Sequence, residues 1–174
     1  MDRRPRDSKV WWYLFEDDGR IPNNPELPLL LYPGALSVSD DLPSECEALG
    51  RENGWGGAWR NGVFTYHHYH STGHEVLGIV RGTARLAFGG ESGVTLELEA
   101  GDVAVIPAGV GHCNSGSSED FLVVGAYPPA QSWDLRTGKP GERPEVLENI
   151  RRVTLAGLDP VFGNEWPLAK YWAE

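Results

Sequence analysis

The ten residues Tyr66-His67-His68-Tyr69-His70-Ser71-Thr72-Gly73-His74-Glu75 (66–75) contain four of the five histidines of the chain. On an extended strand, residues i and i+2 share a face, so we expect His68 and His70 to project together, about 7 Å apart. A turn at Gly73 would then bring Glu75 back beside them on an antiparallel strand. This spacing predicts a strand pair that carries two imidazoles and one carboxylate on one face.

A second segment supplies one more histidine. The apolar residues 103–106 predict a strand, and the turn Pro107-Ala108-Gly109-Val110-Gly111 that follows them places His112 at the start of the next strand. Three imidazoles and one carboxylate suit divalent Fe, Mn, Ni, Co, Cu or Zn, whereas Ca and Mg prefer all-oxygen sites. The sequence therefore predicts one transition-metal ion held by His68, His70, Glu75 and His112.

The rest of the chain predicts an all-β fold with one or two short peripheral helices. Strict alternation of apolar and polar residues in 94–99 is typical of a half-buried strand, and glycine-rich turns separate the other candidates. The expected strands are residues 10–15, 29–32, 63–70, 76–80, 83–88, 94–99, 103–106 and 121–126. The expected helices are 39–53, with Asp40 or Asp41 as N-cap, and 144–152. The prolines around residues 29–32 favour an edge strand or a capping arm.

Composition limits the classes of function. A chain of 174 residues suits one domain, and its net charge of −10 disfavours nucleic acid and anionic membranes as partners. The longest apolar run, residues 10–15, is far shorter than the roughly 20 residues that span a bilayer. The two cysteines, Cys46 and Cys113, are far apart and fit a reduced compartment. We therefore expect a cytoplasmic protein with neither nucleic acid nor a membrane as its partner.

At the histidine-rich segments the chain resembles the cupin superfamily. The first cupin motif is G-x5-H-x-H-x3-4-E-x6-G, and this chain matches it throughout. The second is G-x5-P-x-G-x2-H-x3-N, and this chain differs from it at the last position, where Gly116 replaces Asn. The matching residues are Gly62, His68, His70, Glu75, Gly82, Gly101, Pro107, Gly109 and His112. The flanking segments LFEDDGRIPNNPELPLLLY, HSTGHEVLGI and FLVVGAYPPAQSWDLR resemble the small YjlB-type branch of single-domain cupins.

This resemblance implies a jelly-roll β-barrel, often dimeric, with the metal inside the barrel. We expect one cupin domain over residues 1–174, with a barrel core at about 60–127, an N-terminal arm 1–59 and a C-terminal tail 128–174. A homodimer is the expected assembly. The resemblance implies no single reaction, because cupins include dioxygenases, isomerases and metal-free binding domains.

Three open questions concern the neighbours of the metal ligands. His74 is an alternative to Glu75 as the fourth ligand, and otherwise we expect it to be a turn residue, a hydrogen-bond partner of a ligand or a proton carrier. Phe64 and Tyr66 should line the barrel interior, and Tyr66 is a candidate catalytic residue because a buried phenol needs a polar partner. Asn114 should also face inward. Core or dimer-interface packing is expected for Trp11, Trp12, Trp55, Trp59 and Trp172.

Two functions follow from these expectations. The first is a metal-dependent enzyme that acts on a small polar molecule, with a dioxygenase favoured and an isomerase second. The second is a non-catalytic module that binds or senses a metabolite.

Overall fold

The structure is a computed structural model that describes residues 10–165 and 167–173. Its strands are β1 Trp11–Tyr13, β2 Leu29–Tyr32, β3 Gly56–Asn61, β4 Glu75–Arg81, β5 Thr83–Phe88, β6 Val94–Glu99, β7 Val103–Ile106, β8 His112–Ser117 and β9 Leu122–Tyr127. Its helices are α1 Leu42–Glu52, α2 Glu145–Arg152 and α3 Leu168–Tyr171.

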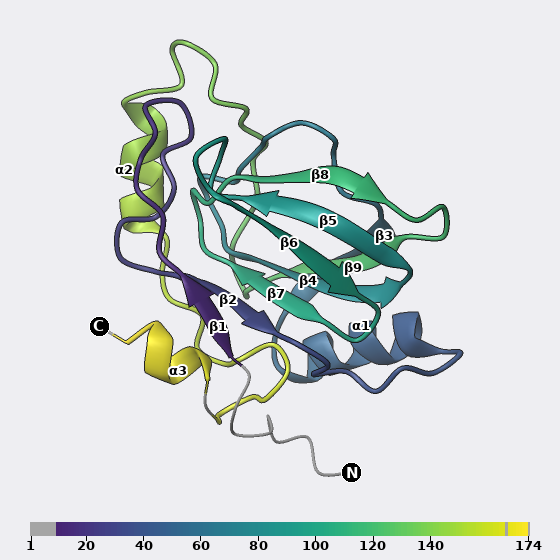
Figure 1. Cartoon of the computed structure of the whole chain (residues 1–174). Coiled ribbons are helices and arrows are strands. Elements are labelled where there is room, and N and C mark those ends of the chain that lie inside the picture. Colours follow the sequence, from purple (N-terminus) through teal and green to yellow (C-terminus); the bar gives the residue numbers. More distant parts are fainter. Residues whose placement is uncertain (1–9, 166, 174) are drawn as a thin grey trace.

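The strands form two antiparallel sheets, one of six strands in the order β1-β2-β7-β4-β9-β3 and one of three in the order β6-β5-β8 (Figure 1). The prediction of a mostly β fold is confirmed. The four-residue helix α3 was not expected.

Side chains that alternate along the strands build two apolar cores, one on each face of the large sheet. On β2, Leu29 and Leu31 belong to the core that also takes in Leu86 and Phe88 of the small sheet. Leu30 and Tyr32 belong to the other core, which faces α1 and the C-terminal segment. Because both faces are covered, β2 and β7 are apolar at every position, as expected for strands buried on two sides.

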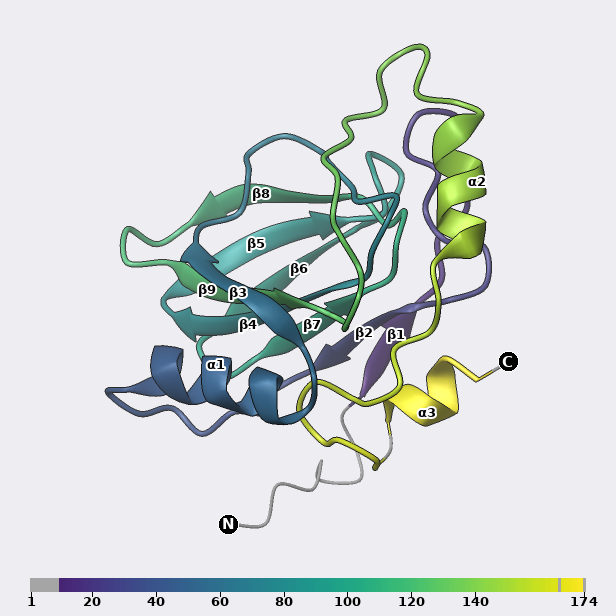
Figure 2. The same ribbon diagram turned by 180° about the vertical axis from the view of Figure 1, so that it is seen from behind.

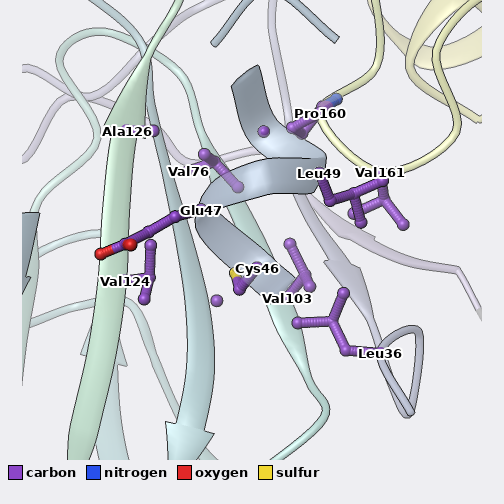
Figure 3. A pocket seen from close by; sticks show the side chains of 12 residues that line it. Leu36, Cys46, Glu47, Leu49, Val76, Val103, Val124, Ala126, Pro160 and Val161 are labelled. Atoms are coloured by element: carbon purple, nitrogen blue, oxygen red, sulfur yellow. The ribbon is translucent and has the colours of Figure 1, made fainter. Parts of the chain in front are cut away.

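Helix α1 covers the outer face of the large sheet (Figure 2). Its side chains Cys46 and Leu49 line a small cavity of about 20 Å³ together with Val76 and Val103 (Figure 3). A Cβ atom on Gly78 of β4 would lie 2.6 Å from the Cys46 sulfur, so this position requires glycine for the helix to pack so closely. The predicted helix is therefore confirmed, and it begins after Asp41 with Pro43 in its first turn.

The structure corrects two predictions about the strands. Strand β2 lies between β1 and β7, so it is not an edge strand, and the prolines flank it without interrupting it. Residues 63–70 do not form a continuous strand. After β3, which was not predicted, the chain leaves the large sheet at Gly62 and crosses to β8. It forms isolated bridges only, at His68 to His112 of β8 and at Tyr69 to Arg136. A segment that crosses between sheets has a partner at single residues only, which is why its strand-like sequence does not form a ladder.

The tryptophans divide into two groups. Trp55 and Trp172 are buried in the core, as expected, and Trp59 is partly buried. Trp11 and Trp12 of the edge strand β1 are about half exposed, so neither packs in the core, and dimer-interface packing, the other expectation, stays a prediction for both. Among the described residues no helix is long and apolar enough to cross a membrane.

Candidate metal centre

Three histidines from two separate segments meet where the 62–70 crossing passes β8. The backbone of His68 forms two hydrogen bonds with that of His112, of 3.1 and 2.9 Å, which bring the two residues side by side. The possible ligand atoms of His68, His70 and His112 all lie within 4.8 Å of one another, and all three residues are buried. The structure thus brings together the three histidines that the sequence predicted.

The ring orientation of each histidine is fixed by the protein backbone. The Nδ1–H groups of His68 and His112 donate to the carbonyl oxygens of Tyr66 and Val110, each over 3.1 Å. His70 Nδ1 donates to the carbonyl oxygen of Asp134. Since a carbonyl only accepts, the proton of each neutral ring is on Nδ1, and Nε2 keeps its lone pair. Metal-binding histidines in proteins are oriented in this way.

Glu75 lies against two of these imidazoles. At the start of β4, its Oε2 atom is 3.1 Å from His70 Nε2 and 3.2 Å from His112 Nε2. Two ligands that are each about 2.1 Å from one ion, at angles of 90–109°, lie roughly 3.0–3.4 Å apart. The observed separations therefore fit adjacent ligands of one ion, and the donor set fits a divalent transition metal.

Burial and mutual charge set the protonation of the cluster. Burial, with the neighbouring His112 as the second cause, lowers the pKa of His68 to about 3. Burial alone would raise the pKa of Glu75, but His70 and His112 hold it far below its ordinary value. Burial likewise opposes the charged form of His70, yet the Glu75 carboxylate raises its pKa. The Glu75 carboxylate thus favours positive charge at His70 Nε2, which a proton supplies in the metal-free protein and a bound ion would supply in its place.

His74 is buried but lies outside this cluster. Its Nδ1 accepts a hydrogen bond of 2.9 Å from the Ala108 N–H, and its Nε2 donates one of 3.1 Å to the Thr154 carbonyl. Its ring also contacts Trp172, with 4.7 Å between the ring centroids. Both nitrogens are occupied by backbone groups, so the geometry does not support His74 as a ligand or a proton carrier. It fixes the turn before the second histidine segment.

Tyr66, Phe64 and Asn114 are not in the interior, contrary to expectation. Phe64 is 51% exposed and Tyr66 45% exposed, because the crossing segment runs along the rim of the sheets. Their rings still contact His68, with centroids 5.1 and 5.9 Å away. The Asn114 side chain accepts a hydrogen bond from the Gly116 N–H and donates one to the Ser117 hydroxyl, both within its own strand β8.

Sequence reasoning assigned no role to two residues that support the site. Tyr127 at the end of β9 donates a hydrogen bond of 3.2 Å to Glu75 Oε1 and accepts one of 2.8 Å from Trp59 Nε1. The register of β4 and β9, which pairs Val76 with Ala126, places Tyr127 beside Glu75. Pairing the two predicted strands would have revealed this contact.

Asp134 is the second such residue. Its carbonyl orients His70, and its carboxylate accepts hydrogen bonds of 2.6 Å from both the N–H and the hydroxyl of Ser71. No sequence signal points to this contact, because 64 residues separate Asp134 from His70.

These two sheets, with a histidine triad and a glutamate at one end, define a cupin, and the profile of the cupin domain matches residues 60–124. The chain is 45% identical over 162 residues to the uncharacterized protein YjlB of Bacillus subtilis (strain 168), which covers 93% of this chain and 96% of that protein. The chain therefore belongs to the cupin superfamily, in the YjlB-type branch of small single-domain cupins.

Several solved structures are similar over part of the chain. An acireductone dioxygenase from Bacillus anthracis with a cadmium ion in its active centre is 18% identical, with 72% of this chain and 82% of that chain covered and a TM-score of 0.41. An 11S allergen from Cocos nucifera is 22% identical, with 56% and 29% covered and a TM-score of 0.40. A DMSP lyase is 23% identical, with 47% and 41% covered and a TM-score of 0.37. The chain thus spans less than half the length of the lyase and allergen chains.

Proposed function

We propose that this cupin is a metal-dependent enzyme that acts on a small polar molecule, with His68, His70, Glu75 and His112 as the ligands of one divalent ion. The convergence of three oriented imidazoles and one carboxylate supports this proposal most strongly. A bound divalent transition metal would supply Lewis acidity, open coordination positions and, for a redox-active ion, chemistry with O2. Four protein ligands leave one or two positions for a substrate.

The protein's contribution is a pre-oriented and largely dry donor set. Backbone carbonyls hold the three imidazoles in one tautomer, so little reorganisation accompanies binding. Tyr127, which accepts a hydrogen bond from Trp59, donates one to Glu75 Oε1, while the other oxygen, Oε2, lies next to His70 and His112. On this basis a dioxygenase is our first candidate reaction class.

An isomerase is the second candidate, and the contact between Tyr127 and Glu75 favours it. Its hydroxyl group lies 3.2 Å from Glu75 Oε1, so a phenol and a carboxylate stand together at the edge of the donor set. Such a pair can hold and pass a proton during the interconversion of a hydroxyketone with its enediol.

The test is whether the metal-loaded full chain converts small α-hydroxyketones and enediols. Oxygen consumption in an electrode chamber would support the dioxygenase, whereas deuterium uptake from D2O without oxygen consumption would support the isomerase. Calorimetric binding without either reaction would contradict the enzyme and favour the non-catalytic module. Metal-free protein is the control in each case.

A further inference from the structure

Three exposed aromatic side chains surround the candidate metal centre. Phe64, Tyr66 and Trp133 are 51%, 45% and 53% exposed. Single exposed apolar side chains are ordinary, but a group gathered at one site marks a binding surface. We call Phe64, Tyr66 and Trp133 the aromatic rim.

Each part of the aromatic rim contacts a different ligand histidine. Phe64 and Tyr66 stack on each other, with centroids 5.0 Å apart and an interplanar angle of 16°, and both lie beside His68. The ring of Trp133 lies 5.9 Å from that of His70. Because the rings of His68 and His70 are 5.8 Å apart, the rim adjoins both at close range.

The rim is also held rigidly. The carbonyl of Tyr66 accepts the hydrogen bond that orients His68, and Asp134, next to Trp133, does the same for His70. Trp133 stacks on Tyr127 at 5.9 Å and 18°, and the loop before it is fixed by a hydrogen bond of 2.6 Å from Thr72 to the Ser132 carbonyl. Exposed rings that are already ordered lose little entropy when a ligand covers them.

The aromatic rim indicates the shape of the ligand. Aromatic rings favour flat apolar or π-bonded partners, either stacked or edge to face. A donor set of three imidazoles and a carboxylate leaves coordination positions that suit oxygen atoms. The carboxylate of Asp134, which follows Trp133 in the chain, is engaged by Ser71 and Arg136, so the rim presents rings to the ligand.

We propose that the site takes a small molecule with a flat, unsaturated or aromatic body joined to a pair of oxygen donors. The oxygens occupy the open positions of the metal, and the body lies against Phe64, Tyr66 and Trp133. This inference rests on the proposed metal centre and adds the substrate class.

Two hydroxamates that share one chelating group test this inference. Benzohydroxamate carries a phenyl ring where acetohydroxamate carries a methyl group, and binding of each to the metal-loaded full chain is measured by calorimetry. We expect benzohydroxamate to bind roughly ten- to a hundredfold more tightly. Trp133→Ala and, separately, Phe64→Ala should reduce this ratio at least about threefold while leaving the affinity for acetohydroxamate unchanged.

Trp11→Ala is the matched control, because it removes a tryptophan that is 51% exposed on the edge strand β1 and should leave both affinities unchanged. Metal content is measured for every variant, so that loss of the ion is not mistaken for loss of the rim. Equal binding of the two hydroxamates by wild-type protein would overturn the rim proposal and leave the metal centre intact. If neither bound better to metal-loaded than to metal-free protein, the metal centre itself would fail.

A second copy of this chain is the other occupant that an exposed aromatic group suggests. If it covered the rim, Trp133→Ala would lower the sedimentation coefficient, and the phenyl ring would bring no gain in affinity. That pair of results would also overturn the proposal.

Discussion

The buried histidines of this protein lie in two regions, the candidate metal cluster and the turn that contains His74. The two regions differ in what the second ring nitrogen contacts. His74 is 1% exposed, and His68, His70 and His112 are 4%, 7% and 2% exposed, so burial does not separate them. In each histidine of the cluster, Nδ1 donates a hydrogen bond to a backbone carbonyl and Nε2 faces the other possible metal ligands. In His74 both nitrogens are bound to the backbone. A second nitrogen that faces the other possible ligands instead of the backbone, and not burial or position in a motif, distinguishes a candidate ligand from a structural histidine.

The largest effect is expected for His112→Ala. Loss of a residue that merely orients a ligand costs about ten- to a hundredfold in metal affinity, so loss of a ligand should cost more than about a hundredfold. Calorimetric titration of the metal-free variant with Zn or Co measures this, and circular dichroism verifies its fold. Wild-type affinity in this variant would remove His112 from the donor set.

His74→Ala should give the opposite pattern. It leaves the Ala108 N–H and the Thr154 carbonyl without their partner and opens a cavity beside Trp172. We expect a loss of about 2–4 kcal/mol in the free energy of unfolding, measured in urea, with metal stoichiometry retained. Loss of the metal with unchanged stability would transfer the ligand role from Glu75 to His74.

The contribution of His74 to the stability of the protein should depend on pH. Burial lowers the pKa of His74 to about 4 from 6.5, so between these values the unfolded chain binds a proton that the folded chain does not. The stability from neutral His74 is complete above pH 6.5 and falls as the pH drops towards 4. The stability difference between wild-type protein and His74→Gln, measured without metal, should shrink by about 2–3 kcal/mol from pH 7.5 to 4.5. A difference independent of pH would show that the pKa of His74 is the same in the folded and the unfolded chain, which would contradict its burial as a neutral ring.

Glu75→Gln should have the smallest of these effects. The variant keeps the size of the side chain and an oxygen for the ion but removes the negative charge, so we expect metal affinity to fall about tenfold. The exposed Glu97→Gln on β6 is the matched control for the loss of one charge. An equal affinity change in both variants would mean that Glu75 acts only through the net charge of the protein.

Local patterns predicted much of this structure and failed where distant segments meet. Residues 83–88, 94–99 and 103–106 form strands with the predicted bounds, because alternation and turns are local. Residues 63–70 were predicted as a strand because their local pattern is typical of one. The sequence does not show that this segment crosses from one sheet to the other. The placements of Tyr127, Trp133 and Asp134 at the site depend on contacts with residues more than 50 positions away.

Within the site, the i and i+2 spacing correctly brought His68 and His70 to one cluster, although His68 lies on a single bridge and His70 lies outside any strand. The sequence could not decide whether His74 or Glu75 is the fourth ligand, because the partners of His74 are the backbone groups of the distant residues Ala108 and Thr154.

The central claim is that His68, His70, Glu75 and His112 hold one divalent ion. Elemental analysis of the full chain, purified without an affinity tag and then offered Fe, Mn, Ni, Co or Zn, tests it most directly. The account predicts close to one ion per chain in wild-type protein and in His74→Gln, and none in His112→Ala. Wild-type protein that holds only traces of metal and takes up none would contradict it.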